Sequence, residues 1–216
     1  MIWWTTTNNP NYVEYMEIRE YEGQDLSSIN HFAENSIKGP QQVDINDYNL
    51  TITGLVNTEL VYTYDEILND QQNHKKVITL KCVEGWSATI LWEGIRIKDL
   101  LQPTQISPEA NTVIFYAYDG YTTALPLDYI LDNNIMIAYK MNNVTMPAER
   151  GYPFQLVAES KWGYKWIKWL TQIEISDNED YPATGKAATG PTTQTCKNHC
   201  FIAFLNFLIE HRPKLT

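Results

Sequence analysis

One cysteine in the first half of the chain is the residue best suited to chemistry. Cys82 lies in the run Lys81-Cys82-Val83-Glu84-Gly85-Trp86-Ser87, directly after the apolar stretch Val77–Leu80, which is typical of a strand. A thiol at the end of a strand suits the presentation of a sulfur atom to a bound group, and thiolates select thiophilic metals and clusters. A single thiolate leaves the other ligands of such a metal to a cofactor that carries its own sulfur atoms.

Two other roles for Cys82 stay open from the residues alone. A free cysteine is often a small buried hydrophobic side chain. It can also be a nucleophile, which requires a nearby histidine or a cationic pocket. The spacing of the four histidines points to no such pairing with Cys82: His31, His74, His199 and His211.

The chain around Cys82 resembles the molybdenum-binding core of the sulfite oxidase superfamily. The resemblance begins with Cys82–Ser87, Trp92-Glu93-Gly94 and the helix-like Ile97–Leu101. Further blocks follow in the order of that family, and they are Tyr118–Tyr121, Ala138-Tyr139 with Met141-Asn142, Gly151–Phe154 and Gly163–Trp169. With an N-terminal block around His31–Gln41, the similarity spans about residues 20 to 182.

This resemblance implies a cofactor and a reaction. The cofactor is molybdopterin, whose dithiolene sulfurs hold a molybdenum ion, and Cys82 is the thiolate ligand from the protein. Because the cofactor performs the redox step, the implied reaction is oxygen-atom transfer on a small substrate. The electrons are exchanged with a separate protein partner.

The phosphate of the cofactor implies a cationic binding site, which the resemblance assigns to the C-terminal blocks. Lys168 matches the family's phosphate-contacting lysine, and Trp166 and Ile167 beside it offer main-chain contacts. Arg150 falls where relatives place His or Asn, and Gln155 falls where the family usually has an arginine. Glutamine donates hydrogen bonds but supplies no charge, so the phosphate is held more weakly or Arg150 compensates.

The positive charges of this region allow a second interpretation. Arg150, Lys161, Lys165 and Lys168 stand against a single counter-charge, Glu159, within one stretch of the chain. They belong either to a solvated strand face or to a seat for an anionic group.

Other residues match the family's pterin loop and its metal-facing tyrosine. Phe32, Ala33, Glu34 and Asn35 resemble the loop that lies along the pterin, and Asn30 is a second candidate beside Asn35. Tyr121 matches the tyrosine near the metal's oxygen ligands, where a phenol can donate a hydrogen bond, although a turn aromatic is the alternative. Asp119 either contacts the pterin or only forms the Asp-Gly turn.

The substrate expected from the resemblance is a neutral S-oxide. Sulfite oxidases line their oxyanion pocket with arginines, but this chain has Ser87 and Glu34 at two of those positions and only four arginines in all. A sulfite dianion would be poorly paired there. The Cys-Val-Glu-x-Trp-Ser motif instead resembles the catalytic subunit of methionine sulfoxide reductases. Two alternatives stay open, a sulfite-oxidising enzyme and a cofactor-free binding module that keeps the fold.

Composition excludes several other classes of protein. The 216 residues are enough for one well-buried core. A net charge of −10 argues against nucleic-acid binding. No apolar run approaches the roughly 18 residues that cross a membrane, and Met1–Thr5 lacks the features of a secretory signal, which favours the cytoplasm. Three cysteines give no even disulfide framework.

The elements expected along the chain are mainly strands. Period-two alternation predicts a strand from Tyr48 to Val56, and Thr63–Glu66 fits a capping box that starts a short helix. A second short helix, Ile95–Leu101, ends before Pro103. Further strands are predicted over Val77–Cys82, Val113–Tyr118, Ile135–Met141, Phe154–Ala158 and Trp166–Ile175. Strands without a regular βαβ alternation predict an α+β fold with a dominant mixed sheet, as the sulfite-oxidase-like resemblance also implies.

The chain divides into a long domain and a short tail. Residues 1–182 are expected to form the molybdopterin-binding oxidoreductase domain, and residues 183–195 have the low-complexity composition of a linker. Cys196–Arg212 has the pattern of a short apolar helix of unknown role. It either docks or dimerises, or contributes Cys196, His199 and Cys200 to a metal site that lacks a fourth ligand.

Overall fold

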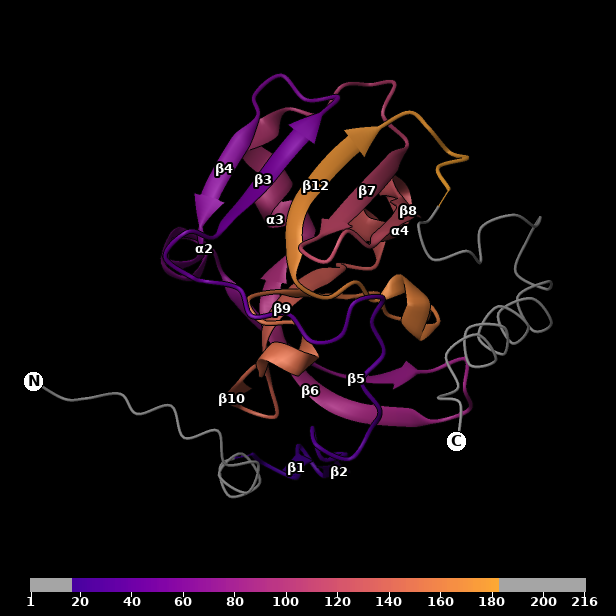
Figure 1. Ribbon diagram of the computed structural model, residues 1–216. Coiled ribbons are helices and arrows are strands. Elements are labelled where there is room, and N and C mark those ends of the chain that lie inside the picture. Colours follow the sequence, from indigo (N-terminus) through magenta and orange to yellow (C-terminus); the bar gives the residue numbers. More distant parts are fainter. Residues whose placement is uncertain (1–16, 183–216) are drawn as a thin grey trace, which may run out of the picture.

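A computed structural model describes residues 17–182, and their strands form two five-stranded sheets (Figure 1). The upper sheet has the order β4-β3-β12-β7-β8 and is mixed, because β12 runs parallel to β3 and antiparallel to β7. Its strands are β3 (Asn49–Gly54), β4 (Leu60–Thr63), β7 (Thr112–Ala117), β8 (Thr122–Pro126) and β12 (Leu170–Ser176).

The lower sheet is antiparallel and has the order β10-β9-β6-β5, with β11 also paired to β9. Its strands are β5 (Asn73–Lys81), β6 (Ser87–Arg96), β9 (Met136–Met141), β10 (Val144–Thr145) and β11 (Gln155–Val157). A small ribbon, β1 (Glu20–Tyr21) with β2 (Gln24–Asp25), lies beneath it. The α+β class and the mixed sheet are therefore confirmed, although the strands are divided between two sheets.

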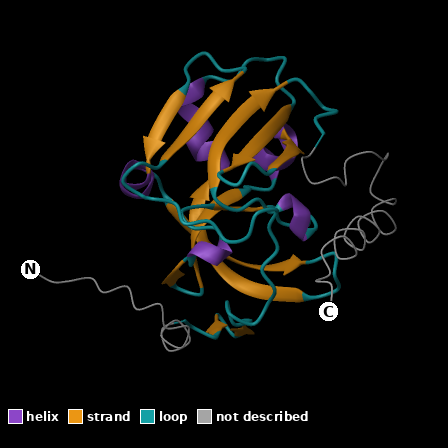
Figure 2. Ribbon diagram, in the orientation of Figure 1, coloured by secondary structure: helices purple, strands orange, loops and turns teal. Residues whose placement is uncertain are grey.

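Helices are few and short (Figure 2). They are α2 (Tyr64–Asp70), α3 (Ile97–Leu101), α4 (Leu127–Asp132) and the 3₁₀ turns η1 (Gln102–Thr104), η2 (Ala148–Arg150) and η3 (Gly163–Lys165). Among the described residues, no helix is both long and apolar enough to cross a membrane. The predicted tail, 183–216, lies outside the described residues, as do residues 1–16.

The longest strand among the described residues, β6, was not predicted. It is paired with β5 on one edge and with β9 on the other, and its residues from Ile90 to Ile95 are buried on both faces. A strand buried on both faces reads as a continuous apolar run without alternation. The shorter strands β4 and β8 were also missed, whereas the predicted strands at β3, β5, β7, β9 and β11 are confirmed.

One predicted strand begins later than expected. The expectation was Trp166–Ile175, but β12 starts at Leu170, because Trp169 has a positive φ of 51° that interrupts extended backbone. Trp166 and Ile167, which precede β12, are buried by contacts with other elements and not by pairing in the upper sheet. The Ile167 carbonyl accepts a hydrogen bond from the Leu156 N–H at 2.8 Å, and Trp166 packs against Trp92 with ring centroids 5.4 Å apart. This packing connects the 163–169 segment to the lower sheet.

The predicted capping box at the start of α2 is confirmed. The Thr63 hydroxyl accepts from the Glu66 N–H at 3.3 Å, and the Glu66 carboxylate accepts from the Thr63 N–H at 2.8 Å. Each bond satisfies a backbone N–H donor that a helix start leaves unpaired. The hydrogen bonds that the Glu66 carboxylate accepts from the Thr63 N–H and the Thr63 hydroxyl lower the pKa of Glu66.

Replacement of Thr63 by alanine is expected to lower the free energy of unfolding by about 1 kcal/mol, since it removes the N-cap acceptor. Urea denaturation followed by circular dichroism measures this difference. Thr58→Ala, a threonine outside the capping box, is the matched control, and an equal loss in both variants would contradict the capping role.

The N-terminal segment is attached to the lower sheet through a buried polar contact. Asn142 accepts from the Leu91 N–H at 3.0 Å and donates to the Ser27 carbonyl at 2.8 Å. It also donates to the buried carboxylate of Glu17 at 3.2 Å, which in turn accepts from the Ile29 N–H at 3.0 Å. These bonds set where the chain leaves the sheet before it reaches residues 32–37.

Candidate active site

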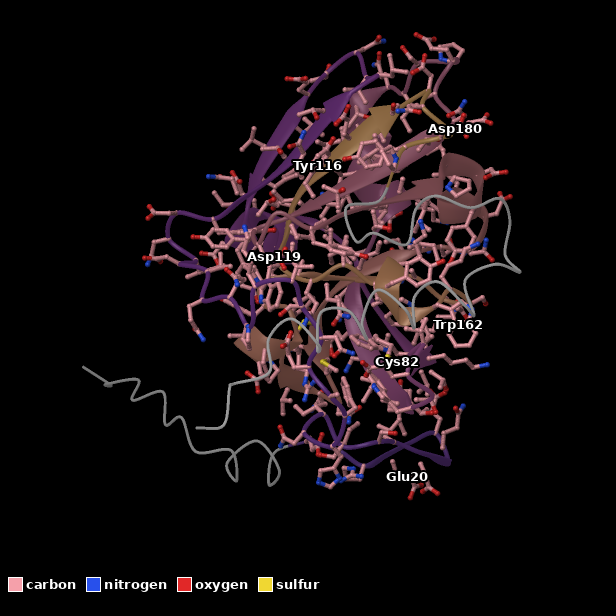
Figure 3. The ribbon with its side chains drawn as sticks, turned by 45° about the vertical axis from the view of Figure 1, so that its right-hand side comes forward. Glu20, Cys82, Tyr116, Asp119, Trp162 and Asp180 are labelled. Carbon is pink, nitrogen blue, oxygen red and sulfur yellow. The ribbon has the colours of Figure 1, made fainter. Side chains whose placement is uncertain are left out.

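A cavity of about 470 Å³ brings together segments that are distant in the sequence. Its walls come from residues 32–37, the turn between β5 and β6, the turn after β7, and the stretch from η2 to the start of β12. Cys82 and Asp119 stand on two of these segments (Figure 3). The residues of the sequence analysis that line the cavity are Phe32, Ala33, Glu34, Asn35, Cys82, Asp119, Tyr121, Arg150, Gln155, Trp166, Ile167 and Lys168.

Asn30 is the one proposed site residue that does not line the cavity. It is exposed, and its backbone N–H donates to the Ser28 hydroxyl at 3.3 Å. The N-terminal wall of the cavity begins two residues later, at Phe32.

A tight turn presents Cys82. The Cys82 N–H donates to the Trp86 carbonyl at 2.9 Å, and the Gly85 N–H donates to the Cys82 carbonyl at 3.1 Å. Gly85 has a φ of 95°, a conformation that glycine adopts without steric cost. The thiol lies on the cavity wall, 3.7 Å from the Asn35 amide nitrogen and 3.9 Å from a Glu84 carboxylate oxygen, and the residue is only 6% exposed.

The environment of Cys82 favours the protonated form of its thiol. Burial raises the pKa of the Cys82 thiol, and the negative charge of Glu84 adds to this rise, although hydrogen bonds from the Glu84 backbone and the Asn35 side chain oppose it. A catalytic nucleophile needs the opposite shift. A metal-free thiol enzyme is therefore disfavoured.

Alkylation of Cys82 in cofactor-free protein is expected to be slower at pH 8 than that of a free thiol, and to accelerate as the pH rises, because only the thiolate reacts. Replacement of Glu84 by glutamine removes a charge that raises the pKa of the Cys82 thiol, and should therefore speed the reaction at pH 8 severalfold. Iodoacetamide labelling with mass spectrometry measures the rate. Glu109→Gln is the matched control, and a fast, pH-independent rate would indicate an activated nucleophile.

Two cations line the cavity, and both contact residues 32–35 of the N-terminal wall, which we call the strap. Arg150 donates to the Phe32 carbonyl at 2.9 Å and to the Ala33 carbonyl at 3.4 Å, with its guanidinium 4.1 Å from the Phe32 ring centroid. Lys168 forms an ion pair with Glu34. Burial lowers the pKa of both cations, and the carboxylate of Glu34 opposes that effect for each.

The other two predicted cations lie elsewhere. The Lys161 ammonium is 4.2 Å from the Tyr129 ring centroid, and Lys165 donates to the Ala124 carbonyl at 3.0 Å. Neither lines the cavity. The run of positive charge in the sequence is thus divided between the cavity and the outer surface.

The turn after β7 is held by hydrogen bonds of its own. The buried carboxylate of Asp119 accepts from the Tyr121 N–H at 2.9 Å, and the Tyr121 hydroxyl donates to the Tyr164 carbonyl at 2.7 Å. Tyr121 therefore braces η3 against the turn. Gln155 is buried at the start of β11, opposite Ala138.

Sequence reasoning assigned no role to several side chains that line the cavity. Glu84 and Glu149 add carboxylates, and Trp86 and Tyr164 add aromatic surface. The Trp86 ring packs on Phe32 with centroids 5.4 Å apart, and its indole N–H donates to Glu84 at 3.2 Å. Glu84 and Trp86 belong to the Cys82 motif itself, which was the available signal.

The lining fits a group that carries its own metal and an anionic end. Among residues 17–182, no three or more His, Cys, Asp or Glu side chains gather to hold a metal ion, so a metal at Cys82 would need ligands from a cofactor. The Nε of Arg150 is buried without a hydrogen-bond partner, which suits an added acceptor. Gly151, with a φ of 112°, lets the backbone pass close to Lys168, where a Cβ would lie 3.0 Å from the lysine Cβ.

Comparison with known proteins places this geometry in context. Residues 37–183 match the family described as oxidoreductase molybdopterin binding domain. The uncharacterized oxidoreductase YuiH of Bacillus subtilis is 31% identical over 144 residues, which are 66% of this chain and 72% of that protein. The protein-methionine-sulfoxide reductase catalytic subunit MsrP of Gluconobacter oxydans is 29% identical over 149 residues, or 61% of this chain and 48% of that protein.

Two more distant similarities complete the comparison. A nitrate reductase [NADPH] of Fusarium oxysporum is 29% identical over 185 residues, or 72% of this chain but 20% of that protein. The crystal structure of the sulfane dehydrogenase SoxCD from Paracoccus pantotrophus has a TM-score of 0.61 at 23% identity, covering 64% of this chain and 40% of that one. That likeness concerns the fold. The chain spans half or less of these relatives, with the B. subtilis protein as the exception.

Proposed function

The chain belongs to the oxidoreductase molybdopterin-binding domain family, and from that premise we propose that it reduces a small neutral S-oxide by oxygen-atom transfer, with Cys82 as the protein ligand of the molybdenum. It is a molybdopterin-dependent oxidoreductase by its family. The substrate, the ligand and the partner named here are the proposal.

The observation that carries the proposal is the meeting of one thiol and two cations in a single cavity. Cys82 lies at one wall, and Arg150 and Lys168 lie at another, with the strap contacting both. A thiol suits molybdenum, and buried cations suit the phosphate of the pterin. When bound, the cofactor supplies two-electron redox chemistry at its metal.

Charge in the cavity supports a neutral substrate. Among residues 17–182, Arg150 is the only arginine of the lining, and its guanidinium donates hydrogen bonds to the strap. Carboxylates of Glu34, Glu84 and Glu149 line the same cavity. An oxyanion needs paired cationic donors, so sulfite and nitrate are poorer candidates than an uncharged S-oxide. The name of the G. oxydans relative, a methionine-sulfoxide reductase subunit, points to the same substrate class.

The residues of the chain have distinct roles in this reaction. Reduction of an S-oxide consumes two electrons and two protons, and the oxygen leaves as water. Glu84 is exposed to solvent and lies 3.9 Å from the Cys82 sulfur, so it is positioned to deliver protons. Asn35 donates to Glu84 at 3.3 Å and thereby orients its carboxylate. Tyr121 holds η3 in place through the Tyr164 carbonyl.

The test uses protein purified from a host that makes molybdopterin. Molybdenum and acid-released pterin are measured first, and then turnover of dimethyl sulfoxide, nitrate and sulfite with reduced methyl viologen or ferricyanide. We expect kcat/KM for the sulfoxide to exceed that for either anion by about tenfold or more. Faster turnover of nitrate or sulfite would overturn the substrate assignment. Protein without metal or pterin would instead indicate a cofactor-free binding module.

A further inference from the structure

The outer edge of β5 carries a groove that the proposed reaction does not use. β5 ends the lower sheet and pairs with β6 on one side only. Along its other side runs the segment 158–162, whose backbone pairs with the strand at one isolated parallel bridge between Lys81 and Trp162. The groove between them has a volume of about 430 Å³ and is lined by Val77, Ile78, Thr79, Lys81, Glu159, Ser160, Lys161 and Trp162.

The groove is positively charged although the chain carries a net charge of −10. Lys81 and Lys161 line it, and Lys76 lies beside it. Within the part of the chain that the structure describes, Glu159 is the only acidic residue of the lining, and it forms an ion pair with Lys76. Lys76, Lys81 and Lys161 therefore leave an excess of positive charge at this edge of an acidic protein.

An exposed tryptophan stands among these lysines. Trp162 is 44% exposed, and Figure 3 shows it at the outer edge of the molecule. Tryptophan is enriched at the centre of protein interfaces, and charged side chains are typical of the polar rim around such a centre. We call Lys76, Lys81, Lys161 and Trp162 the Trp162 surface.

This surface lies directly behind the wall that carries the thiol. Gly163, the residue after Trp162, lines the cavity. A Cβ on Gly163 would lie 3.4 Å from the Lys81 carbonyl oxygen and 3.7 Å from the Cys82 Cα. Lys81 is bonded directly to Cys82. A partner on the Trp162 surface would thus be separated from the site by one layer of backbone.

We propose that the Trp162 surface docks an acidic protein electron carrier. The inference rests on the proposed function, since S-oxide reduction requires two electrons from outside. Each reduced carrier gives up one electron and leaves oxidised, and two such encounters supply one turnover, while the protons come from solvent. Complementary charge selects an acidic carrier over a basic one and raises the rate of encounter.

The experiment uses the molybdenum-loaded chain with all 216 residues and carriers of opposite charge. The acidic probes are a plant-type ferredoxin and a flavodoxin, and the basic probe is cytochrome c. Calorimetry measures binding, and sulfoxide reduction is followed with reduced ferredoxin or flavodoxin and, separately, with reduced methyl viologen.

We expect at least one acidic carrier to bind, and cytochrome c to bind at least about tenfold more weakly. Lys81→Glu and Trp162→Ala should each raise the Kd and the KM for that carrier by about tenfold or more. Both variants should keep the viologen-driven rate.

Lys98→Glu, the same charge reversal on α3, is the matched control and should leave carrier binding unchanged. The proposal is overturned if neither acidic carrier binds, if cytochrome c binds as tightly, or if Lys98→Glu weakens binding as much as Lys81→Glu. It is also overturned if carbodiimide cross-linking of the protein alone joins Lys81 or Lys161 to residues 183–216 or to a second copy. Absence of viologen-driven sulfoxide reduction would count against the proposed function, whereas the binding measurements judge the surface independently.

Discussion

Replacement of Cys82 by serine is expected to abolish both molybdenum retention and sulfoxide reduction. Serine keeps the size of the side chain but replaces a soft sulfur by a hard hydroxyl oxygen, which thiophilic metals bind poorly. The other polar side-chain groups that contact the thiol are the Asn35 amide and the Glu84 carboxylate. Neither can replace a thiolate as a metal ligand. We expect activity to fall by at least about a hundredfold, because the cofactor carries the redox step.

Metal analysis combined with circular dichroism shows whether Cys82→Ser loses molybdenum because the ligand is missing or because the variant does not fold. Pterin and molybdenum are quantified after acid release, and circular dichroism verifies that the variant is folded. Cys196→Ser makes the same chemical change elsewhere in the chain and should retain both metal and activity. Full molybdenum content in Cys82→Ser would show that another group holds the metal.

The turn that carries Cys82 was predictable because its determinants are local. An apolar strand runs into Cys82, and Gly85 supplies the left-handed residue that the turn requires. The same holds for the capping box at Thr63, whose partners are three residues apart. β6 escaped prediction because burial on both faces removes the alternation on which a strand prediction depends.

The composition of the cavity depended on long-range contacts that no local pattern specifies. Arg150 reaches the Phe32 carbonyl across 118 positions of the sequence, and Lys168 pairs with Glu34 across 134. Lys161 and Lys165 share the charge and region of Lys168, yet they point to other partners. Resemblance to a family indicated these positions, whereas residue type alone did not separate them.

Replacement of Lys168 by glutamine is expected to weaken retention of the cofactor by about 10- to 100-fold, the worth of one charge-assisted hydrogen bond to a phosphate. The lysine side chain is 14% exposed, so water replaces it poorly. Glu34 forms an ion pair with the same ammonium, so in the proposed site it would compete with the phosphate. Glu34→Gln should therefore have the opposite effect and strengthen retention.

Lys168→Gln and Glu34→Gln together distinguish a phosphate-binding role of Lys168 from a purely structural ion pair. Loss of a structural ion pair destabilises the fold whichever partner is removed, so both variants would then lose cofactor and melt earlier. If Lys168 binds the phosphate, the two variants should change the rate of pterin release during dialysis in opposite directions, as measured by fluorescence. Lys165→Gln is the matched control, because Lys165 donates to the Ala124 carbonyl and does not line the cavity. Equal pterin release from Lys168→Gln and Lys165→Gln would show that the cavity cation does not hold the phosphate.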